Sequence, residues 1–272
     1  MQISEADASE EVQQSFIFNY VNNDILEEKK IKELFQKWGL NYLTVSSYRF
    51  NQRFEEVSAE PFLLEFFNFP EVRQTLSSMN APKENYSTIK YKRLKVNQIK
   101  MDLFDRLEEN NLVVKDMIKQ TYEDFVEDIQ INDLVRECLI KEESEHYEIF
   151  SEEDRKQFLF RLFQLVVLGG QMCQWEEKLS VYLDATKHLY KNLVTQIQLK
   201  SELNIDELIN LKNRARKDSA TDNIYIDSFV YEIQALDKSY KKGNNPQDVL
   251  YIVVSPSIRM LHVVQNTWVR VW

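Results

Sequence analysis

The chain has 272 residues, of which 43% are apolar and 12% aromatic, and this composition excludes an intrinsically disordered protein. Its length suits one large domain or two small ones and is sufficient to bury a sizeable core. The formal net charge of -10 argues against a general nucleic-acid binder, because such a protein needs clustered lysine and arginine side chains.

The N-terminal part predicts a flexible segment followed by a strand, a helix and a second strand. Residues 1–14 are acidic and polar and lack the layout of a signal peptide, which favours a cytosolic protein. Residues 15–21 and 42–54 are rich in aromatic and β-branched side chains, as strands are. Residues 25–38 carry apolar side chains at helical spacing, and Gly39 follows at the position where helices commonly end in the left-handed conformation.

The next part predicts a short helix, a loop, a strand and a broken helical region. Residues 59–69 read as a helix that stops before a proline, and residues 80–87 as a polar loop. Residues 87–100 suggest a strand whose small basic patch is either solvated surface or a docking point for an acidic partner. We expect residues 101–140 to be mainly helical, most clearly over 121–140.

A strong helix is predicted after the acidic segment at residues 141–150. Ser151 is a good N-cap for a helix over 151–168, and the three acidic residues that follow it place negative charge at the positive end of the helix dipole. Only Arg161 and Gln164 interrupt the apolar run of this helix, which should therefore be buried on most sides.

The remaining residues change from helical to strand-like. Residues 179–193 again show helical spacing, and 201–217 suggest a polar helix before a loop near 218–222. Residues 223–236, 248–254 and 259–272 resemble strands, and the Ser-Pro-Ser sequence at 255–257 predicts that the last two form a hairpin.

This order of elements predicts an α+β fold. An antiparallel sheet from N- and C-terminal strands would pack on a mainly helical middle. We expect a single domain over residues 15–272, with its helical middle at 101–213.

Gly169 and Gly170 lie in the most apolar stretch, and three interpretations of them are possible. A membrane span needs about 20 apolar residues, and the apolar run is shorter and contains Arg161. A phosphate loop needs lysine and a hydroxyl residue after the glycines, where this chain has glutamine and methionine. A structural role remains: the glycines either cap the buried helix or let another element cross it closely.

No metal or cofactor site is predicted. The three histidines are widely spaced, and Glu143 with His146 forms only a single Glu-x-x-His motif, whereas a di-iron site needs two. Asp184 and His188 are expected to form a helix-stabilising pair.

Catalytic groups are equally sparse. Two carboxylate pairs within 123–128 would share a helix face, where they are expected to be solvated. Cys138 and Cys173 are interpreted as buried, reduced thiols, although a cysteine–histidine pair assembled in space stays an open alternative. No nucleophile-elbow motif occurs.

Three blocks of the sequence resemble a known family. The central block at 146–194, together with the blocks at 50–72 and 251–263, is similar in sequence and order to the cilia- and flagella-associated protein 300 family. The resemblance covers nearly the whole chain and is weakest over roughly 80–135.

The resemblance implies a role in building motile cilia. That family is associated with cytoplasmic preassembly of axonemal dynein arms and with their delivery by intraflagellar transport. The expected partners are a dynein-assembly co-chaperone of the PIH-domain type (kintoun), axonemal dynein subunits and the transport machinery, with no nucleic acid and no membrane. The expected location is the cytoplasm and the cilium. No catalytic residues come with the family, so a non-enzymatic assembly factor is expected.

Five residues are candidates for partner binding: His146, Tyr147, Gln171, Gln174 and Trp175. Partly exposed aromatic side chains with polar neighbours are common interface anchors, although the two aromatic residues could equally be part of the core. The alternative function is an enzyme or small-ligand-binding protein with a pocket in the helical middle, for which Cys173, His188 and the carboxylates at 123–128 would be the candidates.

Overall fold

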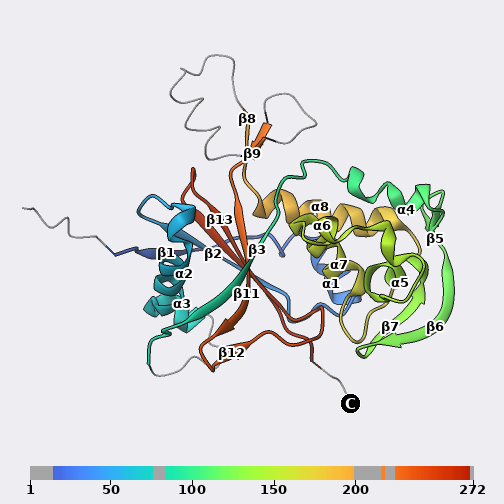
Figure 1. The fold of residues 1–272 in the computed structure, drawn as a ribbon, viewed down its shortest axis with the longest axis horizontal. Helices are drawn as coiled ribbons and strands as arrows, with labels where there is room; N and C mark the ends of the chain where they lie inside the picture. Colours follow the sequence, from blue (N-terminus) through green and yellow to red (C-terminus); the bar gives the residue numbers. More distant parts are fainter. Residues whose placement is uncertain (1–14, 76–83, 199–215, 218–223, 270–272) are drawn as a thin grey trace, which may run out of the picture.

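The computed structural model describes residues 15–75, 84–198, 216–217 and 224–269. Its centre is a seven-stranded antiparallel sheet that curves into a half-barrel and joins both ends of the chain, which confirms the predicted α+β class (Figure 1). Its strands are β1 (Phe18–Val21), β2 (Thr44–Phe50), β3 (Ile89–Leu94), β11 (Phe229–Leu236), β12 (Tyr240–Lys241), β13 (Val249–Ser255) and β14 (Met260–Asn266).

The strand order places C-terminal strands inside the sheet. The order runs β1-β2-β14-β13-β11, and β3 pairs with the free side of β11. Strands β13 and β14 form the hairpin that the Ser-Pro-Ser sequence predicts, with Ser255 opposite Met260. The register of β14 against β2, with Leu261 opposite Tyr48, ties the two ends of the chain together.

Strand β13 is buried on both faces and contributes side chains to two hydrophobic cores. Successive side chains of a strand point to opposite faces of its sheet. Leu250, Ile252 and Val254 accordingly join an aromatic-rich core on one face. Val249 and Tyr251, like Val253, join a larger core on the other face. The sheet is therefore the middle layer of three.

Helices cover both faces of the sheet, as Figure 1 shows. The aromatic-rich core lies under α2 (Ala59–Asn68) and α3 (Pro70–Thr75), where Phe62 and Phe66 of α2 meet Phe18 of β1 edge to face. The larger core contains α1 (Lys29–Lys37), α7 (Phe158–Leu168) and α8 (Leu179–Leu193).

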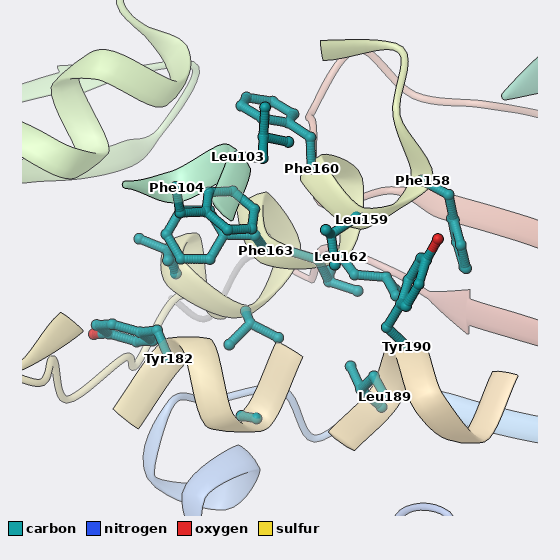
Figure 2. Close-up of a cluster of buried hydrophobic side chains, with 14 of the residues drawn as sticks. Leu103, Phe104, Phe158, Leu159, Phe160, Leu162, Phe163, Tyr182, Leu189 and Tyr190 are labelled. Atoms are coloured by element: carbon teal, nitrogen blue, oxygen red, sulfur yellow. The ribbon is translucent and has the colours of Figure 1, made fainter. Parts of the chain in front are cut away.

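Helix α7 forms the centre of the larger core, as its apolar run predicts. Every residue of α7 except Arg161 is buried. Figure 2 shows Phe163 facing Phe104, at 4.2 Å between ring centroids, while Phe158 lies toward Tyr190 of α8. Among the described residues, none of the helices combines the length and apolarity that crossing a bilayer requires.

The predicted helix over 151–168 is divided into two. Helix α6 (Glu152–Arg155) begins at the Ser151 cap, whose hydroxyl accepts a hydrogen bond from the Asp154 backbone, and α7 starts after Gln157. The end of β3 causes the break, because the backbone of Lys95 donates to the Lys156 carbonyl at 2.9 Å and accepts from the Phe158 amide at 2.8 Å.

The prediction of a helix over 121–140 is wrong for its first two-thirds. Strands β6 (Gln120–Val126) and β7 (Ile129–Asp133) form a hairpin there, and only α5 (Leu134–Ile140) is helical. In β7 the side chains of Ile129, Ile131 and Asp133 are buried alternately, which is the period of a strand. The carboxylates at 123–128 therefore lie on an exposed hairpin and not on a helix face.

The remaining elements are short. A hairpin joins β4 (Val113–Val114) to β5 (Met117–Ile118), near α4 (Arg106–Glu109). Strands β8 (Gln196–Gln198), β9 (Arg216–Lys217) and β10 (Ile224–Ile226) form a separate sheet. The predicted flexible N-terminus, the loop near 218–222 and nearly all of the predicted polar helix lie outside the described residues.

Candidate functional site

The double glycine is the point at which the linker between α7 and α8 crosses the end of α1. Gly169 ends α7 with φ +62°, and Gly39 ends α1 with φ +70°. The Gly170 amide donates to the Trp38 carbonyl at 2.7 Å, and the Gln174 amide donates to the Lys37 carbonyl at 2.9 Å. A Cβ atom on Gly170 would lie less than 3.0 Å from the Gly39 carbonyl group. Both structural interpretations therefore hold: one glycine caps the helix and the other permits the close crossing.

Three of the predicted partner-binding residues lie on this linker. Gln171 and Gln174 are exposed, and Trp175 is half-buried. The guanidinium carbon of Arg136 lies 5.3 Å from the centre of the Trp175 ring, within the range of a cation–π contact. Met172, between the glutamines, leaves 70% of its surface exposed. The linker thus presents polar and apolar side chains on a backbone that α1 holds in place.

Arg136 is fully buried and connects this linker to α5 and α8. It forms an ion pair with Asp133, the N-cap of α5, and donates to the Val167 carbonyl at 2.6 Å and to the Tyr182 hydroxyl at 2.9 Å. Burial acts to lower the pKa of Arg136, but the Asp133 carboxylate, Tyr182 and Cys173 outweigh it and the net shift is upward. The arginine therefore remains charged and satisfies a carbonyl at the C-terminal end of α7.

The other two predicted residues lie on the segment between α5 and α6. His146 and Tyr147 are half-buried, and the guanidinium of Arg155 stacks on the Tyr147 ring at 3.6 Å from its centre. Arg155 is buried and donates to backbone carbonyls, including those of Cys138 and Leu139 at 2.9 Å. These carbonyls belong to the last turn of α5, so Arg155 places a positive charge at the negative end of the dipole of that helix.

The structure does not bring the five predicted residues into one site. Trp175 contacts Arg136 in the first turn of α5, whereas Tyr147 contacts Arg155 at the last carbonyls of α5. Helix α5 has seven residues, which corresponds to a length of about 10 Å. They therefore form two groups at opposite ends of one short helix.

Tyr147 of the second group borders a cleft of about 500 Å³. Its buried floor contains Leu139, Arg155, Phe160 and Gln164, and Arg161 extends into it from α7. The remaining wall comes from the hairpin turn at 126–127, the segment 140–147, and Asn244 and Pro246. The alternative function predicted a pocket in the helical middle, but of its candidate residues only Glu127 lines this cleft. Its only signal was Arg161, the one charged residue in the apolar run of α7.

The residues that the alternative function requires do not converge. The Nε2 of His188 donates to the Ile25 carbonyl at 2.7 Å, and its Nδ1 lies 3.2 Å from Glu28, so the contact predicted with Asp184 is replaced by contacts with the segment before α1. His146 lies 3.8 Å from Glu145, and Cys173 lies beside Arg136. Within the described part of the chain, no three histidine, cysteine or acidic side chains form a group suited to a metal ion.

Both thiols are expected to react slowly. Burial raises the pKa of Cys138 to about 12 and that of Cys173 to about 11, so each is almost wholly protonated at pH 8. Because the thiolate is the reactive form, alkylation of the native protein by iodoacetamide at pH 8 should be at least ~100-fold slower than that of N-acetylcysteine. Mass spectrometry measures this rate, and protein unfolded in urea, in which both cysteines should react quickly, is the control. Rapid labelling of Cys173 in the native protein would instead support a nucleophilic role.

Comparisons with known proteins agree on one family. A sequence model of the family described as "Cilia- and flagella-associated protein 300" matches residues 15–266. A Paramecium tetraurelia protein of that name is 43% identical over 262 residues, which cover 95% of this chain and 96% of the relative. A Chlamydomonas reinhardtii protein of the same name is 27% identical over 265 residues, covering 91% and 95% of the two chains. No solved structure matches the chain.

Proposed function

The chain belongs to the cilia- and flagella-associated protein 300 family, and on this premise we propose that it serves the cytoplasmic preassembly of axonemal dynein arms and their intraflagellar transport. The observation that carries the proposal is the match over residues 15–266, because it includes both the sheet and the helical layer that builds the cleft. The proposed partners are a PIH-domain co-chaperone, axonemal dynein subunits and the transport machinery. The proposed sites of action are the cytoplasm and the cilium.

Recognition without catalysis is the proposed mode of action. The two cores fill both faces of the sheet, while large aromatic side chains are exposed on β6, where Tyr122 leaves 94% and Phe125 60% of its surface open. Exposed aromatic side chains that lie away from a core are typical of interaction surfaces. The linker with Gln171, Gln174 and Trp175 and the segment with His146 and Tyr147 are the two further surfaces that we propose for partner contact.

Gene disruption tests this function. A ciliated cell that lacks this protein should still form cilia, but electron microscopy of axonemal cross-sections should show missing dynein arms, and beating should be slow or absent. Re-expression of the unaltered chain should restore the arms. In the same cells, immunoprecipitation from cytoplasm should recover dynein heavy chain together with this protein. Axonemes with a full set of arms and normal beating in the null cell would contradict the proposal.

A further inference from the structure

The cleft beside α5 contains two arginine side chains, Arg155 and Arg161, to which the described part of the chain gives no paired carboxylate. Among the described residues, neither Arg155 nor Arg161 forms an ion pair, whereas Arg106, on the neighbouring α4, is paired with Asp154 at 2.6 Å. Burial lowers the pKa of Arg155 and repulsion from Arg161 acts in the same direction, whereas Tyr147, Cys138 and Glu148 raise it, and the net shift is downward. Since the whole chain has a formal net charge of -10, two arginines without an ion pair in a partly buried cleft are unusual for this protein.

The two arginines differ in how far their hydrogen bonds are satisfied. Arg155 donates to four backbone carbonyls, those of Phe150, Leu139, Cys138 and Tyr147. Arg161 donates only to the Gln164 side chain, at 3.3 Å, and its Nε is buried without an acceptor in the described structure. Arg155 therefore serves the fold, while Arg161 keeps donors available for a ligand.

An anion is the chemistry that completes such a site. A buried N–H group without an acceptor costs about 1–3 kcal/mol, and a guanidinium group binds carboxylate and phosphate in a bidentate way. The cleft of about 500 Å³ also falls in the usual size range of ligand sites. Gln164 supports the arrangement, because its amide nitrogen donates to the Leu139 carbonyl at 3.2 Å and leaves its oxygen facing Arg161.

The rim of the cleft favours a carboxylate over a phosphate group. Three exposed glutamates, Glu127, Glu142 and Glu143, surround the opening. They would repel a polyphosphate or another strongly charged anion. A peptide can combine one carboxylate for Arg161 with lysine or arginine side chains for the rim and apolar side chains for Phe160 and Tyr147. A protein segment therefore matches the whole lining.

We propose that this cleft binds a peptide segment of a partner protein in which a single glutamate or aspartate, flanked by apolar and then basic residues, pairs with Arg161. The inference rests on the proposed function in that the ligand is a protein partner. It adds to that function the chemistry of the recognised segment and the residue that recognises its carboxylate, Arg161.

Peptide titration of the full chain tests this site. The probes are two peptides with acetylated N-termini and amidated C-termini, Lys-Leu-Glu-Leu-Lys and Lys-Leu-Gln-Leu-Lys, and inorganic phosphate. Isothermal titration calorimetry measures the binding of each. The glutamate peptide should bind at least ~10-fold more tightly than the glutamine peptide, because only its carboxylate accepts from the guanidinium. Equal binding of the two peptides, no binding of either, or phosphate binding more tightly than the glutamate peptide would overturn the proposal.

Two arginine variants separate recognition from folding. Arg161→Gln should abolish the preference for the glutamate peptide and leave the melting temperature unchanged or raised, because it removes a charge that repels Arg155. Arg49→Gln, an exposed arginine on β2, is the matched charge control and should keep the preference. A fall in the melting temperature of Arg161→Gln, or a preserved peptide preference in it, would assign Arg161 to the fold and overturn the proposal. Loss of arms in null cells does not depend on either result, so the two proposals can fail separately.

Discussion

Replacing Gly170 with alanine is expected to destabilise the folded protein by at least about 3 kcal/mol, because it forces extra volume into a packed crossing. The new methyl group would overlap the backbone of Gly39, which cannot rotate away as a side chain can. Separating the two segments would also break the hydrogen bond from the Gly170 amide to the Trp38 carbonyl. Urea unfolding followed by circular dichroism measures the loss, and little soluble folded protein is the expected extreme.

Gly39→Ala is the matched control for this prediction. At Gly39 a Cβ atom would meet its neighbours at 3.4 Å, which is nearly ordinary contact, so the main cost is the left-handed φ of +70°. That strain costs roughly 1–2 kcal/mol. If Gly170→Ala proved as mild as Gly39→Ala, the linker and the end of α1 would not cross closely in solution.

Arg136→Met is expected to cost about 3–5 kcal/mol, the usual penalty for removing one partner of a buried ion pair. The substitution leaves the Asp133 carboxylate buried without its counter-charge and removes the donors to the Val167 carbonyl and the Tyr182 hydroxyl. It also removes the cation beside Trp175. Chemical unfolding measures the stability, and a changed tryptophan emission spectrum in the folded state would report the altered surroundings of Trp175.

The double variant Asp133→Asn with Arg136→Met isolates the cost of the unpaired charge. Asparagine can still cap α5, so the double variant should be more stable than Arg136→Met alone, with a measurable coupling energy between the two positions. Equal stabilities would mean that the lone carboxylate is not what destabilises Arg136→Met. Arg161→Met, at the one half-buried position of α7, is the second control and should change stability little.

The sheet and the helical layer that contains α7 and α8 could be predicted from sequence because their signals are periodic, whereas the layer that α2 and α3 form on the other face was not predicted. Strands β2, β11, β13 and β14 are rich in β-branched and aromatic residues. Helix α7 is almost entirely apolar, and α8 carries apolar residues at helical spacing over its whole length. The hairpin β6–β7 could not, because its turn residues Glu127 and Asp128 adopt φ +48° and +66° without the glycine or asparagine that normally marks such a turn. The carboxylates at 123–128 are spaced four residues apart, which also fits one face of a helix.

The candidate site was only partly predictable, for reasons of distance along the chain. The close crossing could be proposed because the two glycines are adjacent in sequence, but Gly39, which Gly170 crosses, lies 131 residues earlier (170 − 39), and nothing local identifies it. The half-buried state of Tyr147 and Trp175 depends on the buried arginines Arg155 and Arg136, which belong to other elements. The cleft draws its lining from four separate segments, so no local pattern could indicate it.

The position of β14 between β2 and β13 has a consequence for synthesis. On the ribosome, β1 and β2 emerge more than 200 residues before Met260, the residue that begins their neighbour. The N-terminal pair must therefore wait, with an unpaired edge, until β14 has been translated. A nonsense mutation immediately before Met260 should accordingly be as damaging as an early one, because it deletes β14, an interior strand, and leaves a product for degradation.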